Sequence, residues 1–145
     1  MTSVADVLKQ KGSTVFTIHQ EDTIRTAMDL LAKQGVGALV VTDHEGELTG
    51  IFTERDFARF CAGKDSISLT SPISEVMTPK VICVDPTYSV EHCLGIMTDM
   101  RMRHLPVLTN QKLSGLISIG DAVKAVLTEQ EHLIDQLEHY IAGSL

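Results

Sequence analysis

Two seven-residue segments of this chain carry side chains that could bind a ligand. Gly50–Asp56 and Gly115–Asp121 both have a glycine at the first position, a hydroxyl at the fourth and a carboxylate at the seventh. In both, an apolar run typical of a strand leads into the start of a helix, where free backbone N–H groups and a hydroxyl can bind a phosphate. The carboxylate can accept two hydrogen bonds from the vicinal hydroxyls of a ribose. The pattern therefore indicates a nucleotide.

The same polar residues have a simpler interpretation. Thr53 and Ser118 can act as helix N-caps, and Asp56 and Asp121 can interact with the positive end of the helix dipole. One such segment alone would favour the caps. Two segments in matching register favour a ligand.

Both segments belong to a longer internal repeat. Six apolar positions have an apolar counterpart 66 residues later, and the polar positions match at an offset of 65 after one deletion near Asn110. The apolar pairs are Val15/Val81, Ile18/Val84, Ile24/Val90, Leu31/Met97, Leu39/Leu105 and Val41/Val107. Such a repeat predicts two copies of one structural unit.

Each copy predicts the order helix, strand, helix, strand, strand, helix. In the first copy we expect strands over 15–18, 38–42 and 48–52, and a helix that starts at the N-cap Thr23 and stops at Gly35. In the second copy we expect a helix capped by Ser89 and a hairpin of strands 105–108 and 113–117.

The fold class predicted from this order is α+β. A repeat of about sixty residues leaves one apolar sheet face exposed, so it needs the second copy to cover that face. We expect repeats 1–62 and 73–128, joined by a polar linker over 63–72, to pack sheet against sheet about a pseudo-twofold axis. That arrangement creates two similar clefts between the repeats.

Residues 129–145 are predicted to extend the last helix as an amphipathic segment. Its apolar stripe exceeds what one repeat can cover, and we expect part of it to contact a second copy in a homodimer. The alternative, that the helix folds back onto its own core, is equally compatible with the pattern.

Composition excludes several classes of protein. The chain has 145 residues, is 43% hydrophobic and 21% charged, and carries 12 basic against 19 acidic side chains, for a net charge of −7. These values are those of a folded globular chain. The acidic balance argues against nucleic acid or an anionic membrane as a partner, because phosphate contacts require a basic surface.

Three features predict a cytoplasmic location. The three cysteines are odd in number and lack CxxC spacing, which is typical of a reducing compartment. No charged-then-apolar leader precedes the first amphipathic segment. No apolar run approaches the roughly 18 residues that a membrane span requires.

No catalytic residues or metal ligands are predicted. Histidines such as His104, His132 and His139 lack metal-ligand spacing, and the sequence offers no nucleophile paired with a base. Gly35-Val36-Gly37 leads into a strand instead of following one, so it is not a dinucleotide fingerprint. We therefore do not expect an enzyme.

Four motifs taken in order resemble a known family. They are Gly37–Val41, Gly50–Asp56, Arg103–Val107 and Gly115–Asp121. Together they look like a tandem pair of cystathionine-beta-synthase (CBS) domains, and the resemblance covers Val7–Ala62 and Val76–Leu127. It implies a stand-alone two-repeat regulatory protein that binds AMP, ATP or NAD in clefts between the repeats and modulates an unknown protein target.

The resemblance also implies two composite sites, each joining the motif of one repeat to the strand starts of the other. In the family the Asp holds the ribose, the hydroxyl reaches a phosphate and backbone at the strand starts holds adenine. One site would comprise Ile51, Thr53, Asp56, Lys80, Ile82, Arg103, His104 and Pro106. The other would comprise Leu116, Ser118, Asp121, Thr14, Phe16, Val36, Gly37 and Ala38.

The two implied sites differ in charge. Arg101, Arg103 and His104 stand where the first repeat has Gly35, Gly37 and Ala38. Charge-assisted hydrogen bonds to phosphate are about twice as strong as neutral ones. We therefore expect the site of Asp56 to bind phosphate better, unless the arginines are ordinary exposed charges at a helix end.

Overall fold

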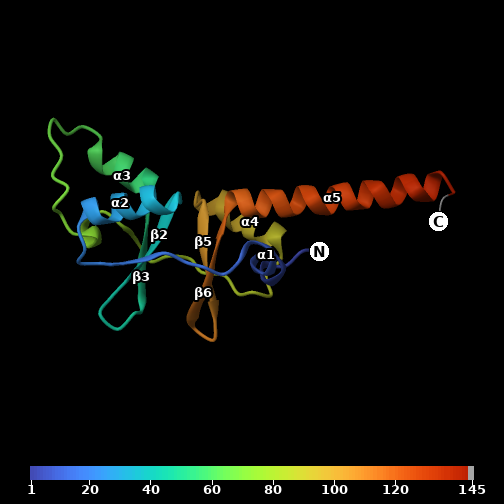
Figure 1. Cartoon of the computed structure of the whole chain (residues 1–145), viewed down its shortest axis with the longest axis horizontal. Coiled ribbons are helices and arrows are strands. Elements are labelled where there is room, and N and C mark those ends of the chain that lie inside the picture. Colours follow the sequence, from blue (N-terminus) through green and yellow to red (C-terminus); the bar gives the residue numbers. More distant parts are fainter. Residues whose placement is uncertain (144–145) are drawn as a thin grey trace. The chain divides into compact units, whose positions relative to one another are not determined.

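The computed structural model describes residues 1–143, which form two compact units. Thr14–Ile82 makes up the first, and Met1–Ser13 joins the described part of Cys83–Leu145 in the second. We call them the 14–82 unit and the 83–143 unit, and Figure 1 labels their helices and strands. The fold is α+β with five α-helices among the described residues, as the repeat pattern predicts.

The 14–82 unit is built on a mixed four-stranded sheet. Strands β1 (Thr17–His19), β2 (Ala38–Thr42), β3 (Leu48–Thr53) and β4 (Thr78–Pro79) lie in the order β1-β2-β3-β4. β1 runs parallel to β2, and the other two pairings are antiparallel.

Two helices and a short 3-10 turn accompany this sheet. They are α2 (Ile24–Gln34), α3 (Glu54–Cys61) and η1 (Ile73–Glu75). The apolar face of α2 supplies Ile24, Ala27 and Leu31 to a core that also contains Leu39 and Phe52. This core holds β2 and β3 in place, and those strands carry the Gly50–Asp56 motif.

The 83–143 unit repeats the pattern with a smaller sheet. Its elements are α1 (Val4–Lys11), α4 (Val90–Met100), β5 (His104–Thr109), β6 (Lys112–Ser118) and α5 (Ile119–Ile141). β5 and β6 form an antiparallel hairpin, and Val84 makes a parallel bridge to Val107. This bridge matches the pairing of Ile18 with Val41 in β1 and β2. The first strand of the second repeat is thus reduced to one bridge.

Local signals in the sequence placed the helix ends correctly. Thr23, Thr53, Ser89 and Ser118 are all N-caps whose side chains accept a backbone N–H three residues on. Gly35 ends α2 in the left-handed conformation, with φ of 64°. In the second repeat Arg101 takes the same conformation without a glycine, with φ of 53°.

The compact units divide the chain differently from the limits of the sequence repeats. Helix α1, which belongs to the predicted first repeat, packs in the 83–143 unit, whereas residues 73–82 of the predicted second repeat belong to the 14–82 unit. The reason is steric: a Cβ built on Gly115 would lie 2.7 Å from Leu8 of α1, and one on Gly50 would lie 2.7 Å from Met77. Each hairpin glycine leaves room for a side chain from the other predicted repeat.

Helix α5 is continuous through the limit predicted at residue 129. It spans 23 residues, and Ala122 near its start is fully buried. From residue 131 onward every described residue is exposed, and Figure 1 shows α5 running on past the other elements of its own unit. The helix therefore does not fold back onto its core. The last two residues of the predicted extension lie outside the described residues.

Replacing the hairpin glycines by alanine tests the steric explanation. Gly50→Ala should lower the free energy of unfolding by roughly 1–3 kcal/mol, because its Cβ would also lie 2.8 Å from the rigid carbonyl oxygen of Thr78. Gly115→Ala should cost less, since the atoms it meets are the flexible end of Leu8. Urea denaturation of the purified variants measures both effects.

Gly95→Ala is the matched control. Gly95 lies inside α4 with nothing within 4 Å of its built Cβ, so alanine should stabilise the protein by roughly 0.5–1 kcal/mol. Equal losses at Gly50 and Gly95 would contradict the steric explanation.

Candidate functional site

The first motif ends in a carboxylate that is almost fully enclosed. Asp56 is 6% exposed, and its Oδ2 accepts the Thr53 N–H at 2.9 Å and the Thr53 hydroxyl at 3.1 Å. In return the Asp56 N–H donates to the Thr53 hydroxyl oxygen at 3.2 Å, which completes a capping box. The second carboxylate oxygen, Oδ1, accepts the Thr78 hydroxyl at 2.9 Å.

The second motif is held in the same way, but its cation is closer than Arg59, whose guanidinium lies 3.8 Å from Oδ1 of Asp56. Oδ2 of Asp121 accepts the Ser118 N–H at 2.9 Å, and the Asp121 N–H donates to the Ser118 hydroxyl at 3.1 Å. Lys11 Nζ donates to the same Oδ2 at 2.6 Å and to the carbonyl of Leu116 at 2.8 Å. The interpretation of the four motif residues as caps is thus confirmed, and it leaves the ligand interpretation as a proposal.

The carboxylate of Asp121 has a shifted pKa. Its partial burial acts to raise the pKa, but the hydrogen bonds from Lys11 and Ser118 and the positive charge of Lys11 outweigh burial. The pKa of Asp121 therefore lies below its ordinary value. The carboxylate is ionised at neutral pH and suited to accept hydrogen bonds.

Each motif lies next to the strand start of its own repeat. Ala38 pairs with Thr53 across β2 and β3, and the Glu54 N–H donates to the Gly37 carbonyl at 3.2 Å. In the other unit His104 pairs with Ser118, and the Ile119 N–H donates to the Arg103 carbonyl at 2.8 Å. Backbone at the strand start and the first turn of the helix are therefore in contact in both units.

The residues of each predicted site are divided between the units. The 14–82 unit holds Thr14, Phe16, Val36, Gly37, Ala38, Ile51, Thr53, Asp56, Lys80 and Ile82, and the 83–143 unit holds Arg103, His104, Pro106, Leu116, Ser118 and Asp121. Within a unit, the structure brings the motif together with the strand start of the same repeat. The predicted sites pair it with the strand start of the other repeat, and that pairing remains a prediction.

Two residues beside the carboxylates were missed by sequence reasoning. Lys11 belongs to the predicted first repeat and contacts the motif of the second, and Thr78 belongs to the predicted second repeat and contacts the motif of the first. A signal was present: Val7-Leu8 and Lys11 recur as Val76-Met77 and Lys80 at an offset of 69. The family resemblance starts within these segments, and the motif spacing alone does not point to them.

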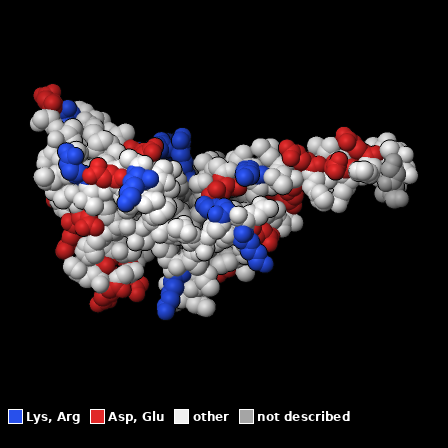
Figure 2. All heavy atoms as spheres, viewed as in Figure 1, with Lys and Arg blue, Asp and Glu red and all other residues white. Residues whose placement is uncertain are grey.

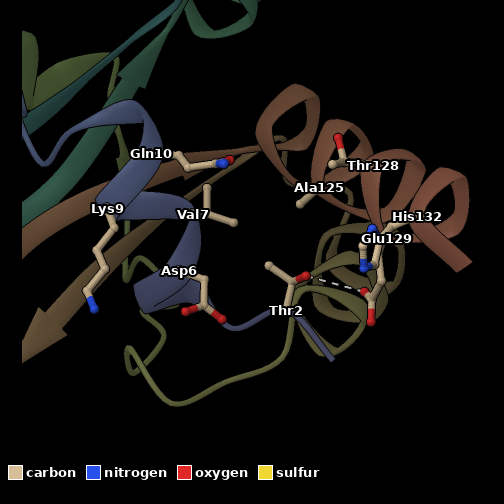
Figure 3. Close-up of a pocket in the computed structure, with 9 residues that line it drawn as sticks. All are labelled: Thr2, Asp6, Val7, Lys9, Gln10, Ala125, Thr128, Glu129 and His132. Atoms are coloured by element: carbon tan, nitrogen blue, oxygen red, sulfur yellow. Dashed lines mark hydrogen bonds between the residues drawn. The ribbon is translucent and has the colours of Figure 1, made fainter. Parts of the chain in front are cut away.

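A groove of about 490 Å³ lies elsewhere in the 83–143 unit, between α1 and α5. Figure 3 shows its lining, to which α1 contributes Asp6, Lys9 and Gln10 and α5 contributes Thr128, Glu129 and His132. The Thr2 hydroxyl donates to Glu129. None of the predicted site residues lines this groove. Its mixed acidic and basic lining gives no basis for assigning a ligand.

A third group of polar side chains lies at the end of β1. Ligand atoms of His19, Glu21 and His44 lie within 4.8 Å of one another, although the sequence predicts no metal site. Nδ1 of His19 already accepts the Glu21 N–H at 3.1 Å, and its Nε2 is closed off from solvent. We therefore assign no metal to this group.

No helix within residues 1–143 combines the length and the apolar character needed to cross a bilayer.

Comparisons with known proteins give one consistent result. The sequence model of the CBS domain matches residues 3–63 and 73–128. The CBS domain-containing protein CBSX3, mitochondrial, of Arabidopsis thaliana is 35% identical over 150 residues, covering 98% of this chain and 73% of the relative. The solved structure of the CBS-domain protein ATU1752 from Agrobacterium tumefaciens is 42% identical with a TM-score of 0.82, covering 86% of this chain and 98% of that one.

Two further solved structures contain ligands. The CBS domain pair of protein MJ0100, in complex with 5′-methylthioadenosine and S-adenosyl-L-methionine, is 25% identical with a TM-score of 0.77, covering 89% of this chain and 98% of that one. CBSX2 in complex with AMP is 21% identical with a TM-score of 0.72, covering 90% and 99%. The second likeness is one of fold.

Lys11→Met tests how the Asp121 carboxylate is held. Without Lys11, less opposes the effect of burial, which raises the pKa of Asp121, so this pKa should rise. A pH titration of the Asp121 side-chain carboxyl signal by NMR measures the change. A carboxyl with a lowered pKa stabilises the fold above the unfolded-state value near 3.9 and loses this effect as pH falls through the folded-state value. The variant should therefore be less stable than the wild type at pH 7, by roughly 0.2–1 kcal/mol for this partly exposed pair, and equally stable in strong acid.

Lys112→Met removes an equal charge from the exposed start of β6 and serves as the control. It should leave the Asp121 titration unchanged. An unchanged titration in Lys11→Met would contradict the role given to Lys11.

Proposed function

We propose, from the premise that this chain belongs to the CBS domain family, that it binds an adenosine derivative such as AMP, ATP or NAD and thereby regulates a protein target. The observation that carries the proposal is the duplicated motif, in which each carboxylate is fixed by a capping box beside a strand start. A relative with the same fold binds 5′-methylthioadenosine and S-adenosyl-L-methionine, and another binds AMP. These ligands share adenosine, so the ribose and the base are the parts the motif has to recognise.

Asp56 and Asp121 are the proposed ribose ligands. Both carboxylates are rigidly oriented, because the capping box fixes one oxygen of each. At Asp56 the other oxygen is held by the Thr78 hydroxyl, so a ribose diol would take the place of that neutral donor. At Asp121 Lys11 donates to the same Oδ2 that the capping box fixes, so a diol that uses this oxygen would compete with a stronger, charge-assisted donor.

Phosphate and adenine are assigned to the other residues of the two predicted sites. Thr53 and Ser118 would reach the phosphate, while backbone near Gly37, Ala38, Arg103 and His104 would hold adenine. Lys80 and Arg103 are exposed cations that the proposal places in the site of Asp56. The prediction that this site binds phosphate better is thus retained.

Regulation would follow from the binding free energy. A ligand at one hundred times its dissociation constant stabilises the binding-competent state by about 2.7 kcal/mol. A target that distinguishes this state from the others responds to the ligand concentration. The proposal includes no covalent step, so the protein is not proposed as an enzyme, and we propose the cytoplasm as its location.

A second candidate function rests on α5. Its outer part presents Leu133, Ile134, Leu137 and Ile141, which are between 51% and 82% exposed. We propose that this face forms a homodimer. If the motifs bind no ligand, the protein is a dimerisation or scaffold module with vestigial sites.

Calorimetric titration with AMP, ADP, ATP and NAD tests the first function. We expect heat of binding and a rise in melting temperature with at least one of them. Asp56→Asn and Asp121→Asn should each weaken one class of site at least 10-fold, because an amide cannot accept charge-assisted hydrogen bonds from both ribose hydroxyls.

Asp6→Asn is a matched control for lost capping. Ser3 and Asp6 form the same capping box at the start of α1, outside both predicted sites. Its affinity should equal that of the wild type. No heat and no thermal shift with any of the four nucleotides would refute the function, and wild-type binding by both motif variants would refute the ribose assignment.

Deleting residues from Glu129 onward separates the two candidate functions. The deletion removes the exposed part of α5 but keeps Ala122 and the core contacts near its start. We expect a monomer in sedimentation experiments that retains nucleotide binding. A truncated protein that stays dimeric would contradict the assignment of the dimer to α5.

A further inference from the structure

The exposed residues of α5 repeat with the period of a coiled coil. The positions 123, 127, 130, 134, 137 and 141 are separated alternately by four and three residues, which places them on one seam of the helix. Five of them are the apolar residues Val123, Leu127, Ile134, Leu137 and Ile141, with exposed fractions of 43%, 53%, 55%, 51% and 82%. Gln130 is the one polar member. The seam begins where α5 still packs on its own unit and faces away from the buried Ala122.

The residues beside the seam differ on its two sides. One flank carries Lys124, Glu131 and Glu138 at intervals of seven, and the other carries Val126, Leu133 and Tyr140. Leu133 and Tyr140 are 55% and 70% exposed. One flank of the seam is therefore charged and the other apolar.

We infer that α5 pairs antiparallel with α5 of a second copy of this chain, in one defined register. In that register Val123 packs against Ile141, Leu127 against Leu137 and Gln130 against Ile134, each contact occurring twice by symmetry. This inference rests on the proposed homodimer and is independent of nucleotide binding.

Charge complementarity selects this arrangement. In an antiparallel pair like flanks face each other, so Lys124 lies opposite Glu138 of the second copy at both ends of the seam. The apolar flanks also meet, with Leu133 against Leu133 and Tyr140 against Val126, which is partly buried on its own core. In a parallel pair the charged flank of each helix would face the apolar flank of the other, with Glu131 against Val126 and Glu138 against Leu133. The parallel pair offers no opposite charges across the seam.

The register also has a cost at its centre. Glu131 faces Glu131 of the second copy, and Figure 2 shows how acidic side chains gather along the outer part of α5. Like charges at this distance weaken pairing.

A charge-reversal cycle on the full-length chain tests the inference, with the dimer dissociation constant measured by sedimentation equilibrium. Lys124→Glu and Glu138→Lys should each weaken the dimer roughly 5- to 30-fold, since each places like charges at two positions. The double variant should return to within about 3-fold of the wild type, because the reversed pair is again complementary. Glu131→Gln should tighten the dimer about 2- to 5-fold.

Asp135→Lys is the matched control, because it changes the net charge as much as Glu138→Lys on the face away from the seam. It should change the dissociation constant less than 2-fold, and circular dichroism should show equal helix content in all variants. If the wild type dimerises but the dissociation constant of the double variant does not return toward the wild-type value, the antiparallel register is wrong and the proposed dimer is retained. A monomeric wild type at 100 µM, roughly the upper end of such measurements, overturns both the register and the proposed dimer, whereas the nucleotide titration decides the sensing function separately.

Discussion

The contact on which both units depend is made by a segment that lies outside the repeat it completes. In the 14–82 unit Met77 fills the space beside Gly50, and Thr78 donates to Asp56. In the 83–143 unit Leu8 fills the space beside Gly115, and its neighbour Lys11 donates to Asp121. An apolar side chain covers the hairpin while a polar one satisfies the carboxylate at the helix start. Neither carboxylate could be buried this far without such a partner.

Most of the fold could be predicted because its signals are local. N-caps such as Thr23 and Ser89 act over three residues, and the glycine that ends α2 acts at one position. The repeat itself is visible as a fixed offset in the sequence. The exchange of α1 and the segment before β4 between repeats depends on contacts across tens of residues, such as Lys11 with Asp121. Periodicity carries no information about such contacts, so the boundaries at 62 and 73 do not coincide with those of the compact units.

The sequence predicts the residues of a candidate site, but not how their side chains are hydrogen-bonded. The sequence identified Thr53, Asp56, Ser118 and Asp121, but treated capping and ligand binding as alternatives. The capping boxes show that the side chains are already hydrogen-bonded, which orients a carboxylate at no further entropic cost when a ligand arrives. At Asp56 the hydrogen-bond donor is the neutral Thr78 hydroxyl, with the Arg59 guanidinium farther away at 3.8 Å, whereas the Lys11 ammonium group contacts Asp121 at 2.6 Å. We therefore expect a diol to displace its competitor more easily at Asp56 than at Asp121. This difference adds to the basic residues as a reason for unequal sites.

Helix α5 joins the two proposed activities in one rigid element. Its first turn contains Asp121, and the seam runs from Val123 to Ile141 without a break in the helix. A ligand that competes with Lys11 for Asp121 would loosen the contact between α1 and the start of α5. Loosening this contact changes dimerisation only if α5 pairs with a different affinity when α1 is held to Asp121 and when it is released. The reason is that a ligand shifts an equilibrium only by the difference in its affinity for the two states. Coupling between nucleotide and dimer therefore depends on Lys11. If it exists, binding at Asp121 must depend on protein concentration, while binding at Asp56, whose donor Thr78 belongs to the 14–82 unit, need not.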